Sequence, residues 1–156
     1  MEADKRFDSV IRTQLSVDES PLSIAELRVP KKFTKATSFF SIVILVRLFD
    51  ESRNYFSIKK TQRQFTAVKF PIARRMLVCI TEQRILIWKL SSWHPQLKFL
   101  GSSDSKGVRA TELARTTHVN WHLITIELDG SRQIRLQIDQ PSAVPFATTI
   151  NATNDK

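Results

Sequence analysis

The 156-residue sequence predicts a mainly β protein: an antiparallel, partly open β-barrel of about seven strands, with short helical segments at the N-terminus. Residues 76–90 (MLVCITEQRILIWKL) form two short apolar arms around a polar turn, and β-branched and aromatic side chains dominate both arms. Residues 122–138 alternate apolar and polar side chains on either side of Asp129-Gly130, a favoured hairpin turn. Further short apolar runs separated by polar turns are typical of a barrel or sandwich.

The two hairpins differ in how much of their surface is apolar. In the first, residues 77–80 and 85–88 are apolar on both faces, so we expect this hairpin to lie in the core. In the second, Ile124, Ile126 and Leu128 share one face while other residues, mostly polar, occupy the opposite face. This second pair should therefore have one buried and one solvated face.

Residues 1–30 are expected to form a helical or loop segment ahead of the barrel. A helical spacing relates four apolar residues, Phe7, Val10, Ile11 and Leu15. A second short helix is expected through Ala25 and Leu27, ending before Pro30, because a proline disfavours the helical conformation of the residue that precedes it.

Residues 31–140 are expected to form the barrel domain. The runs 39–49, 55–58 and 65–70 are typical of strands. The first is the most apolar run of the chain, but it has about half of the ~20 residues that a membrane-spanning helix needs, and Arg47 interrupts it. It is therefore expected to be a core strand or a short core helix, with contact to a membrane surface as the alternative.

The assignments after the central hairpin are less uniform. Residues 96–100 are typical of a strand, and residues 101–107 of a loop. Residues 108–120 fit either a helical turn or an extended segment. Residues 141–156 contain two prolines and end in polar residues, so a flexible C-terminal tail is expected there.

The two hairpins resemble the pleckstrin-homology-like (PH-like) domains of bacteria and, more loosely, GRAM-type domains. The matching features are a Thr-polar-polar-Arg turn between two apolar strands (LVCITEQRILIWKL), a strand around Leu100-Gly101, and a hairpin arm that ends in Leu-Asp-Gly-Ser at residues 128–131. The resemblance covers about residues 76–138, under half of the chain. It implies a partly open barrel of two roughly orthogonal sheets, and a binding or scaffolding role without catalysis.

Domains of this kind usually close one end of the barrel with a C-terminal amphipathic helix. Pro141 and Pro145 oppose a long helix in that place, so the helix at residues 7–15 is expected to fill the barrel end instead. Phosphoinositide-binding relatives carry a basic motif in the first strand loop, and the basic residues within 59–63 come nearest to it in character.

The sequence contains no constellation that indicates catalysis or metal binding. Cys79, the single cysteine, excludes an internal disulfide and lies in an apolar arm, where a buried and inert thiol is expected. His118 and His122 have the spacing of two metal ligands on a helix, but no cysteine or acidic residue has a matching spacing. The glycine-rich motifs of nucleotide-binding and hydrolase sites are absent. We therefore expect no enzyme activity, no cofactor and no metal site.

Positive charge is concentrated in one part of the chain. The net charge is +9, and residues 28–75 hold twelve Lys and Arg against two acidic residues. Such an excess indicates a basic face for an anionic partner, unless the side chains merely solvate exposed strands and loops. The candidate residues of this basic face are Lys31, Lys32, Lys35, Lys59, Lys60, Arg63, Lys69, Arg74 and Arg75.

The sequence thus predicts a non-catalytic binding or adaptor module that docks on a protein partner or an anionic membrane surface through its basic face. A small nucleic-acid-binding β-barrel is the alternative, because aromatic side chains among basic ones can stack on bases. The aromatic candidates are Tyr55, Phe56, Trp88 and Trp93, of which Phe56 and Trp88 are better explained by core packing.

Homo-oligomerisation by pairing of strand edges is a third hypothesis. No signal peptide is visible, so a cytoplasmic location is expected, with peripheral attachment to the membrane as an option.

Overall fold

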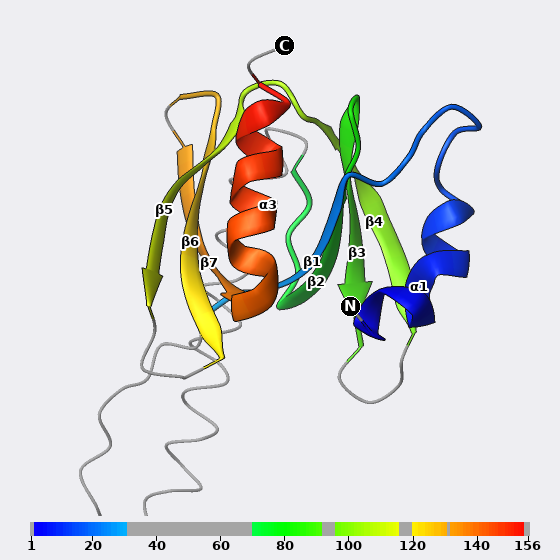
Figure 1. The fold of residues 1–156 in the computed structure, drawn as a ribbon, viewed down its shortest axis with the longest axis horizontal. Helices are drawn as coiled ribbons and strands as arrows, with labels where there is room; N and C mark the ends of the chain where they lie inside the picture. The colour runs from blue at the N-terminus through cyan, green and yellow to red at the C-terminus, as the bar shows by residue number, and fades with distance from the viewer. Residues whose placement is uncertain (1, 31–69, 92–95, 116–119, 131, 155–156) are drawn as a thin grey trace, which may run out of the picture.

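The computed structural model describes residues 2–30, 70–91, 96–115, 120–130 and 132–154. These ranges hold one antiparallel sheet of seven strands in the order β4-β3-β2-β1-β7-β6-β5, with a helix near each terminus (Figure 1). The elements are α1 (Glu2–Arg12), β1 (Ser23–Arg28), β2 (Arg75–Ile80), β3 (Arg84–Leu90), β4 (Leu97–Asp104), β5 (Val108–Arg115), β6 (Trp121–Leu128), β7 (Arg132–Asp139) and α3 (Gln140–Ala152). The edge strands β4 and β5 do not pair with each other, so the sheet is not closed. The predicted mainly β fold with a partly open barrel is confirmed.

The strands form two groups that meet at one narrow contact. β1 pairs with β2 along its whole length, and β6 pairs with β7 in the same way. In contrast, β1 and β7 pair only at Leu27↔Ile138 and Arg28↔Gln137, a contact that we call the seam. In Figure 1, α3 lies across the sheet between the β5–β6–β7 group and the β1–β4 group. The fold therefore consists of two antiparallel units bridged by one helix.

The main core lies between one face of the sheet, here called the inner face, and α3. Alternate strand residues point to this face, as the two-residue period of a strand requires. The buried strand residues include Ala25, Leu27, Met76, Val78, Ile80, Ile85, Ile87, Ile124, Ile126, Leu128, Ile134, Leu136 and Ile138, and α3 contributes Ala143, Phe146 and Ile150. The hairpin of β6 and β7 thus buries the apolar face that its alternation predicts, and that prediction is confirmed.

A second, smaller apolar cluster explains why the central hairpin of β2 and β3 is apolar on both faces. The outer face of this hairpin presents Leu77, Cys79, Leu86, Trp88 and Leu90. The helix α1 covers this face with the fully buried Ile11, and the partly buried Phe7 and Leu15 pack beside it. The central hairpin therefore lies in the core, as predicted, with α3 on one side and α1 on the other (Figure 1). The expectation that the N-terminal helix would fill the barrel end is wrong, because α3 lies on the inner face.

Residues 23–28 form β1, so the predicted second helix is wrong. Ala25 and Leu27 are buried in the main core, whereas Glu26 and Arg28 alternate with them and remain partly exposed. A segment this short does not distinguish a helix from a strand by apolar spacing alone. Its antiparallel pairing with β2 decides the outcome, because that pairing satisfies the backbone of β1.

The predicted flexible tail at residues 141–156 is wrong for the part that the structure describes, because α3 lies there. Pro141 stands in the first turn, where a backbone N–H has no partner within a helix, so nothing is lost. Pro145 lies further inside and removes one internal hydrogen bond. Burial of the apolar face of α3, with Phe146 at its middle, offsets this loss.

The remaining sequence assignments have mixed outcomes. β4 continues through Asp104, so the first half of the predicted loop at residues 101–107 is strand. Residues 108–120 fit either a helical turn or an extended segment on sequence alone, and residues 108–115 of this stretch form β5, which pairs with β6. The Asp129-Gly130 turn is confirmed, with φ of 51° and 66°, a region that glycine enters without strain and aspartate tolerates.

Three predicted strands fall largely beyond the described part of the chain. The predicted strands at residues 39–49 and 55–58 lie outside the described residues, and so does 65–70 up to Phe70. Phe70 is described, is buried in the main core and belongs to no strand.

Asn151 in α3 and Asn154 just after it pair with the backbone at the start of the edge strand β5. The Asn151 side chain accepts a hydrogen bond from the Ala110 N–H (2.9 Å) and donates one to the Ala110 carbonyl (3.0 Å). Asn154 accepts from the N–H of Gly107 (2.7 Å) and donates to the carbonyl of Val108. An amide side chain thereby supplies the donor and acceptor that a neighbouring strand would supply.

Candidate functional site

Of the nine residues predicted to form the basic face, the structure describes two. Arg74 is exposed just before β2, and Arg75 is the first residue of β2. The other seven, Lys31, Lys32, Lys35, Lys59, Lys60, Arg63 and Lys69, lie outside the described residues. The structure therefore places only Arg74 and Arg75 of the predicted set, at the end of the sheet where β1 stops and β2 begins.

Two arginines face each other at this end of the sheet. Arg28 closes β1 and stands directly opposite Arg75 in the antiparallel register. Like charges in opposed positions of neighbouring strands destabilise a sheet. One oxygen of Glu26, Oε1, compensates for this, because it accepts hydrogen bonds from Arg28 Nε (2.7 Å) and Arg75 Nε (2.9 Å). Arg75 Nη2 lies 2.9 Å from the same oxygen.

Arg28 has a second contact, with an aromatic ring from the other group of strands. Its guanidinium carbon lies 4.0 Å from the centroid of the Trp121 ring. A guanidinium over an indole is a favourable cation–π arrangement. This contact crosses the seam, because Trp121 begins β6 while Arg28 ends β1. Arg28 is therefore held by a carboxylate and by an aromatic face at once.

We call Glu26, Arg28, Arg75 and Trp121 the arginine cluster, and the exposed Arg74 directly precedes Arg75 in the chain. The cluster combines two guanidinium groups with one carboxylate, so it carries a positive excess. Arginine stays protonated at all physiological pH values and offers a planar fork of donors that fits carboxylate or phosphate oxygens. The cluster is thus suited to holding an anion.

Sequence reasoning missed three members of the arginine cluster. Arg28 lies in the basic stretch of the sequence, but no local pattern marks Arg28, Glu26 or Trp121 as a site residue. Recognising them requires the register of β1 against β2 and the position of β6 across the seam. The period-two pattern of β1 was the one available signal, and it was masked by the helical interpretation of that segment.

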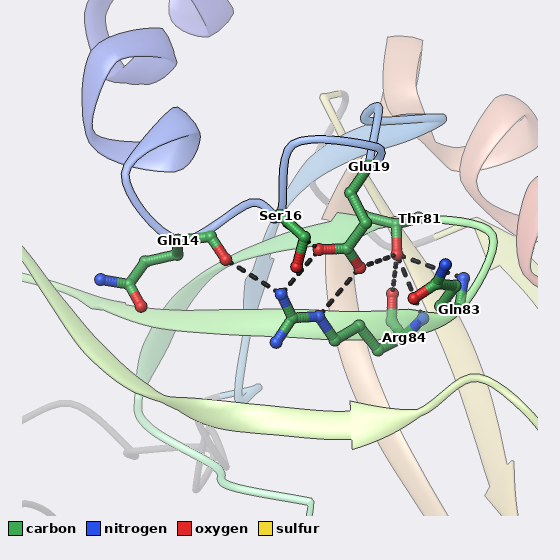
Figure 2. A network of polar contacts seen from close by, with 6 residues as sticks. All are labelled: Gln14, Ser16, Glu19, Thr81, Gln83 and Arg84. Carbon is green, nitrogen blue, oxygen red and sulfur yellow. Dashed lines mark hydrogen bonds and ion pairs between the residues drawn. The ribbon is translucent and has the colours of Figure 1, made fainter.

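A second polar network ties the chain after α1 to the turn between β2 and β3 (Figure 2). Arg84 donates to both oxygens of Glu19, from Nε to Oε1 (2.9 Å) and from Nη2 to Oε2 (2.6 Å). Arg84 Nη2 also donates to the Gln14 carbonyl (3.0 Å), and the Ser16 N–H donates to Glu19 Oε2 (3.0 Å). The Thr81 hydroxyl lies 3.1 Å from Glu19 Oε1.

Glu19 is the most strongly perturbed titratable group among the described residues. Its side chain is 2% exposed, and the hydrogen bonds from Arg84 lower its pKa from 4.5 to about 2, although burial acts in the opposite direction. The same hydrogen bonds raise the pKa of Arg84. A carboxylate of such low pKa is a poor proton acceptor at neutral pH, and the hydrogen bonds that it accepts hold the chain after α1 to the turn before β3.

A small cavity of about 240 Å³ adjoins Glu19. Its lining residues are Asp18, Glu19, Ser20, Leu22, Glu82 and Gln83. The acidic side chains give it a character opposite to that of the arginine cluster, and it lies at the other end of the antiparallel pair formed by β1 and β2. Within the described ranges, no three His, Cys, Asp or Glu residues are grouped as a metal site would require.

The remaining sequence candidates are explained by packing where they are described. Cys79 is fully buried beneath α1, as predicted. Trp88 is also fully buried, with the Phe99 ring centroid 5.5 Å from its own, so the core-packing explanation of Trp88 is confirmed. His122 lies in β6, whereas His118 lies outside the described residues, so the structure gives no distance between the two imidazole side chains. In the part of the chain that is described, no helix is long and apolar enough to cross a membrane.

Comparisons with protein-family models, with curated proteins and with solved structures give no match for this chain.

Proposed function

We propose that this protein is a non-catalytic binding module of the PH-like kind, which docks through its basic face on an anionic membrane surface or on a protein partner. The observation that carries the proposal is the arginine cluster, in which two opposed arginines converge on one carboxylate oxygen. Such a concentration of guanidinium groups at the end of a sheet suits phosphate or carboxylate groups.

The fold supports this proposal. An open antiparallel sheet of seven strands with a C-terminal helix lying across it is the arrangement that the PH-like resemblance implies. The C-terminal helix was the main feature that the sequence argued against, so its presence strengthens the resemblance. A fold alone does not specify a ligand, and the choice of partner therefore rests on charge.

The charge of the chain favours an anionic surface. The segment that joins β1 to β2 begins and ends at the arginine cluster, and its sequence carries most of the excess of Lys and Arg. Each basic side chain near an anionic bilayer contributes about 1 kcal/mol to binding. Several such residues together would recruit the protein to the cytoplasmic face of a membrane without a spanning helix.

Vesicle binding tests the proposal. The full chain should sediment with vesicles that contain phosphatidylserine and not with pure phosphatidylcholine vesicles, and binding should weaken as salt is raised. The variant R28Q/R74Q/R75Q should lose at least about tenfold in affinity. The matched variant R109Q/R132Q/R135Q removes the same charge from exposed positions of the other strand group and should lose much less. Equal losses would contradict a localised basic face.

Nucleic-acid binding is the second candidate function. The observation that favours it is the pairing of Arg28 with Trp121, since basic and aromatic side chains together are typical of single-strand binding surfaces. One face of the Trp121 ring is already covered by Arg28, which reduces its value for stacking on a base. Oligonucleotide binding with a steep salt dependence, and no binding to anionic vesicles, would favour this alternative.

A further inference from the structure

We propose that Glu26 is an internal ligand of the arginine cluster, and that a phosphate group of an anionic membrane displaces it when the protein docks. This inference rests on the proposed function and adds the regulation of that same site: the free protein covers its own anion-binding groups with one of its own carboxylates.

The position of Glu26 is that of a bound anion. A single oxygen, Oε1, lies 2.7 Å from Arg28 Nε and 2.9 Å from both Nε and Nη2 of Arg75. It therefore occupies the point at which the two guanidinium groups converge. A phosphate oxygen would require the same donors at the same distances, so the two anions compete for one position.

The register of the strands favours an anion at this point. Arg28 and Arg75 stand opposite each other, and two cations in that position repel unless a negative group lies between them. Glu26 provides it from the same face of β1, two residues before Arg28. A phosphate that replaced Glu26 would preserve this compensation, whereas simple loss of the carboxylate would not.

The contacts are accessible and exchangeable. The side chains of Glu26, Arg28 and Arg75 are 26%, 36% and 30% exposed, so solvent and ligand reach them. Partly exposed ion pairs contribute little net stability, because water screens them. Arg28 keeps its contact with Trp121 when the carboxylate leaves, so one guanidinium remains in place for the incoming phosphate.

The test compares three variants of the full chain on vesicles that contain phosphatidylserine. E26Q removes the competing carboxylate and should bind about fivefold more tightly than wild type, the factor that corresponds to one basic side chain freed at an anionic surface. E26D keeps the charge but shortens the side chain, so it should bind more tightly than wild type and less tightly than E26Q. E82Q removes an exposed carboxylate at the opposite end of the sheet, beyond the screening length at physiological salt, and should differ from wild type by less than about twofold.

The possible outcomes separate the inference from the function on which it rests. If wild type binds and E26Q binds no more tightly, Glu26 is not a competitor and the inference is overturned while the function stands. An equal gain in E26Q and E82Q would also overturn it, since the gain would then follow net charge alone. If no variant binds anionic vesicles, the proposed function fails and the inference fails with it.

A second measurement, the thermal midpoint with and without inorganic phosphate, does not depend on vesicle binding and also reports whether each variant is folded. Inorganic phosphate should raise the thermal midpoint of E26Q more than that of wild type, because the position of the carboxylate is free only in E26Q. This experiment also separates binding of the phosphate group itself from binding to a bilayer. Equal shifts in wild type and E26Q would count against displacement of Glu26.

Discussion

Glu19 is a carboxylate whose side chain is 2% exposed and whose pKa is about 2, so it keeps its charge through most of the pH range. Burying a charge is costly unless a partner and hydrogen bonds compensate it. Arg84 provides the partner through two parallel hydrogen bonds, the strongest arrangement between these groups. The pair thereby links the segment that follows α1 to the turn before β3.

Replacing Glu19 with glutamine (E19Q) should lower the free energy of unfolding by about 3 kcal/mol near neutral pH, the size that corresponds to a pKa lowered from 4.5 to about 2. Because the pKa is lower in the folded state, this stabilisation is complete above about pH 4.5 and is lost as the pH falls toward 2. Urea unfolding of wild type and E19Q should therefore differ at neutral pH and converge in acid.

The control for this prediction is E82Q, which removes an exposed carboxylate from the same turn and should change the free energy of unfolding by about 0.5 kcal/mol or less. A difference between wild type and E19Q that stayed constant down to pH 2 would show that the pair does not act through its charge.

Single residues also show where sequence reasoning stops. The turn from Thr81 to Arg84 was predicted, because turn chemistry is local. The partner of Arg84 was not, because Glu19 lies 65 residues away along the chain. Glu26 and Trp121 were missed for the same reason, since only the strand register brings them to Arg28.

At the level of the elements, α1 acts as a cover for the outer face of the central hairpin. Ile11 is fully buried against that face, whereas the neighbouring Val10 is 37% exposed. The helix belongs to the apolar packing of the domain through one stripe of side chains, which is the usual source of stability for a short helix in water.

Ile11→Ala should lower the free energy of unfolding by about 2–4 kcal/mol, because it removes buried methyl groups and leaves a cavity under α1. Val10→Ala, on the same helix, should change it by about 0.5 kcal/mol or less, since the exposed side chain loses little and alanine favours the helix. Guanidinium unfolding of both variants measures the contrast. Similar effects of the two substitutions would mean that α1 does not pack as described.

The elements predicted correctly are those with a strong local pattern. The two hairpins of β2–β3 and β6–β7 have apolar arms and a recognisable turn, so their positions were found within a few residues. β1 and α3 were mispredicted because tertiary contacts override local preference in each. The pairing of β1 with β2 satisfies the backbone hydrogen bonds of β1 and so favours a strand. The helix α3 tolerates Pro145 because its apolar face is buried on the sheet.

The whole molecule depends on α3 to hold two strand groups together across the seam. Phe146 is fully buried at the centre of this arrangement. Phe146→Leu should cost about 1–2 kcal/mol through the cavity it leaves. It should increase hydrogen exchange at the seam, around Leu27 and Ile138, more than within the β2–β3 hairpin.

The matched substitution for this prediction is Phe99→Leu, because Phe99 is 37% exposed on β4 and lies far along the sheet from the seam. It should leave exchange at the seam unchanged. An increase in exchange spread evenly over all strands in Phe146→Leu would argue against a sheet made of two separable groups.

At this largest scale the sequence was most informative about fold class and least informative about function. The alternation and length of apolar runs specify an antiparallel β-domain, because those patterns are set by backbone geometry. The bridging role of α3 and the convergence of Arg28 and Arg75 on Glu26 depend on how distant segments meet. Charge counting identified the basic stretch of residues 28–75 but not Glu26, which lies just before it.

Deamidation of Asn151 or Asn154 would weaken the hydrogen bonds that these side chains make with the backbone at the start of β5. Deamidation turns an asparagine into an aspartate, whose carboxylate accepts hydrogen bonds and donates none. At Asn151 the carbonyl of Ala110 would then face a negative charge in place of an N–H donor. Old preparations are expected to expose the edge of β5 to other chains and to aggregate while their cores are still intact.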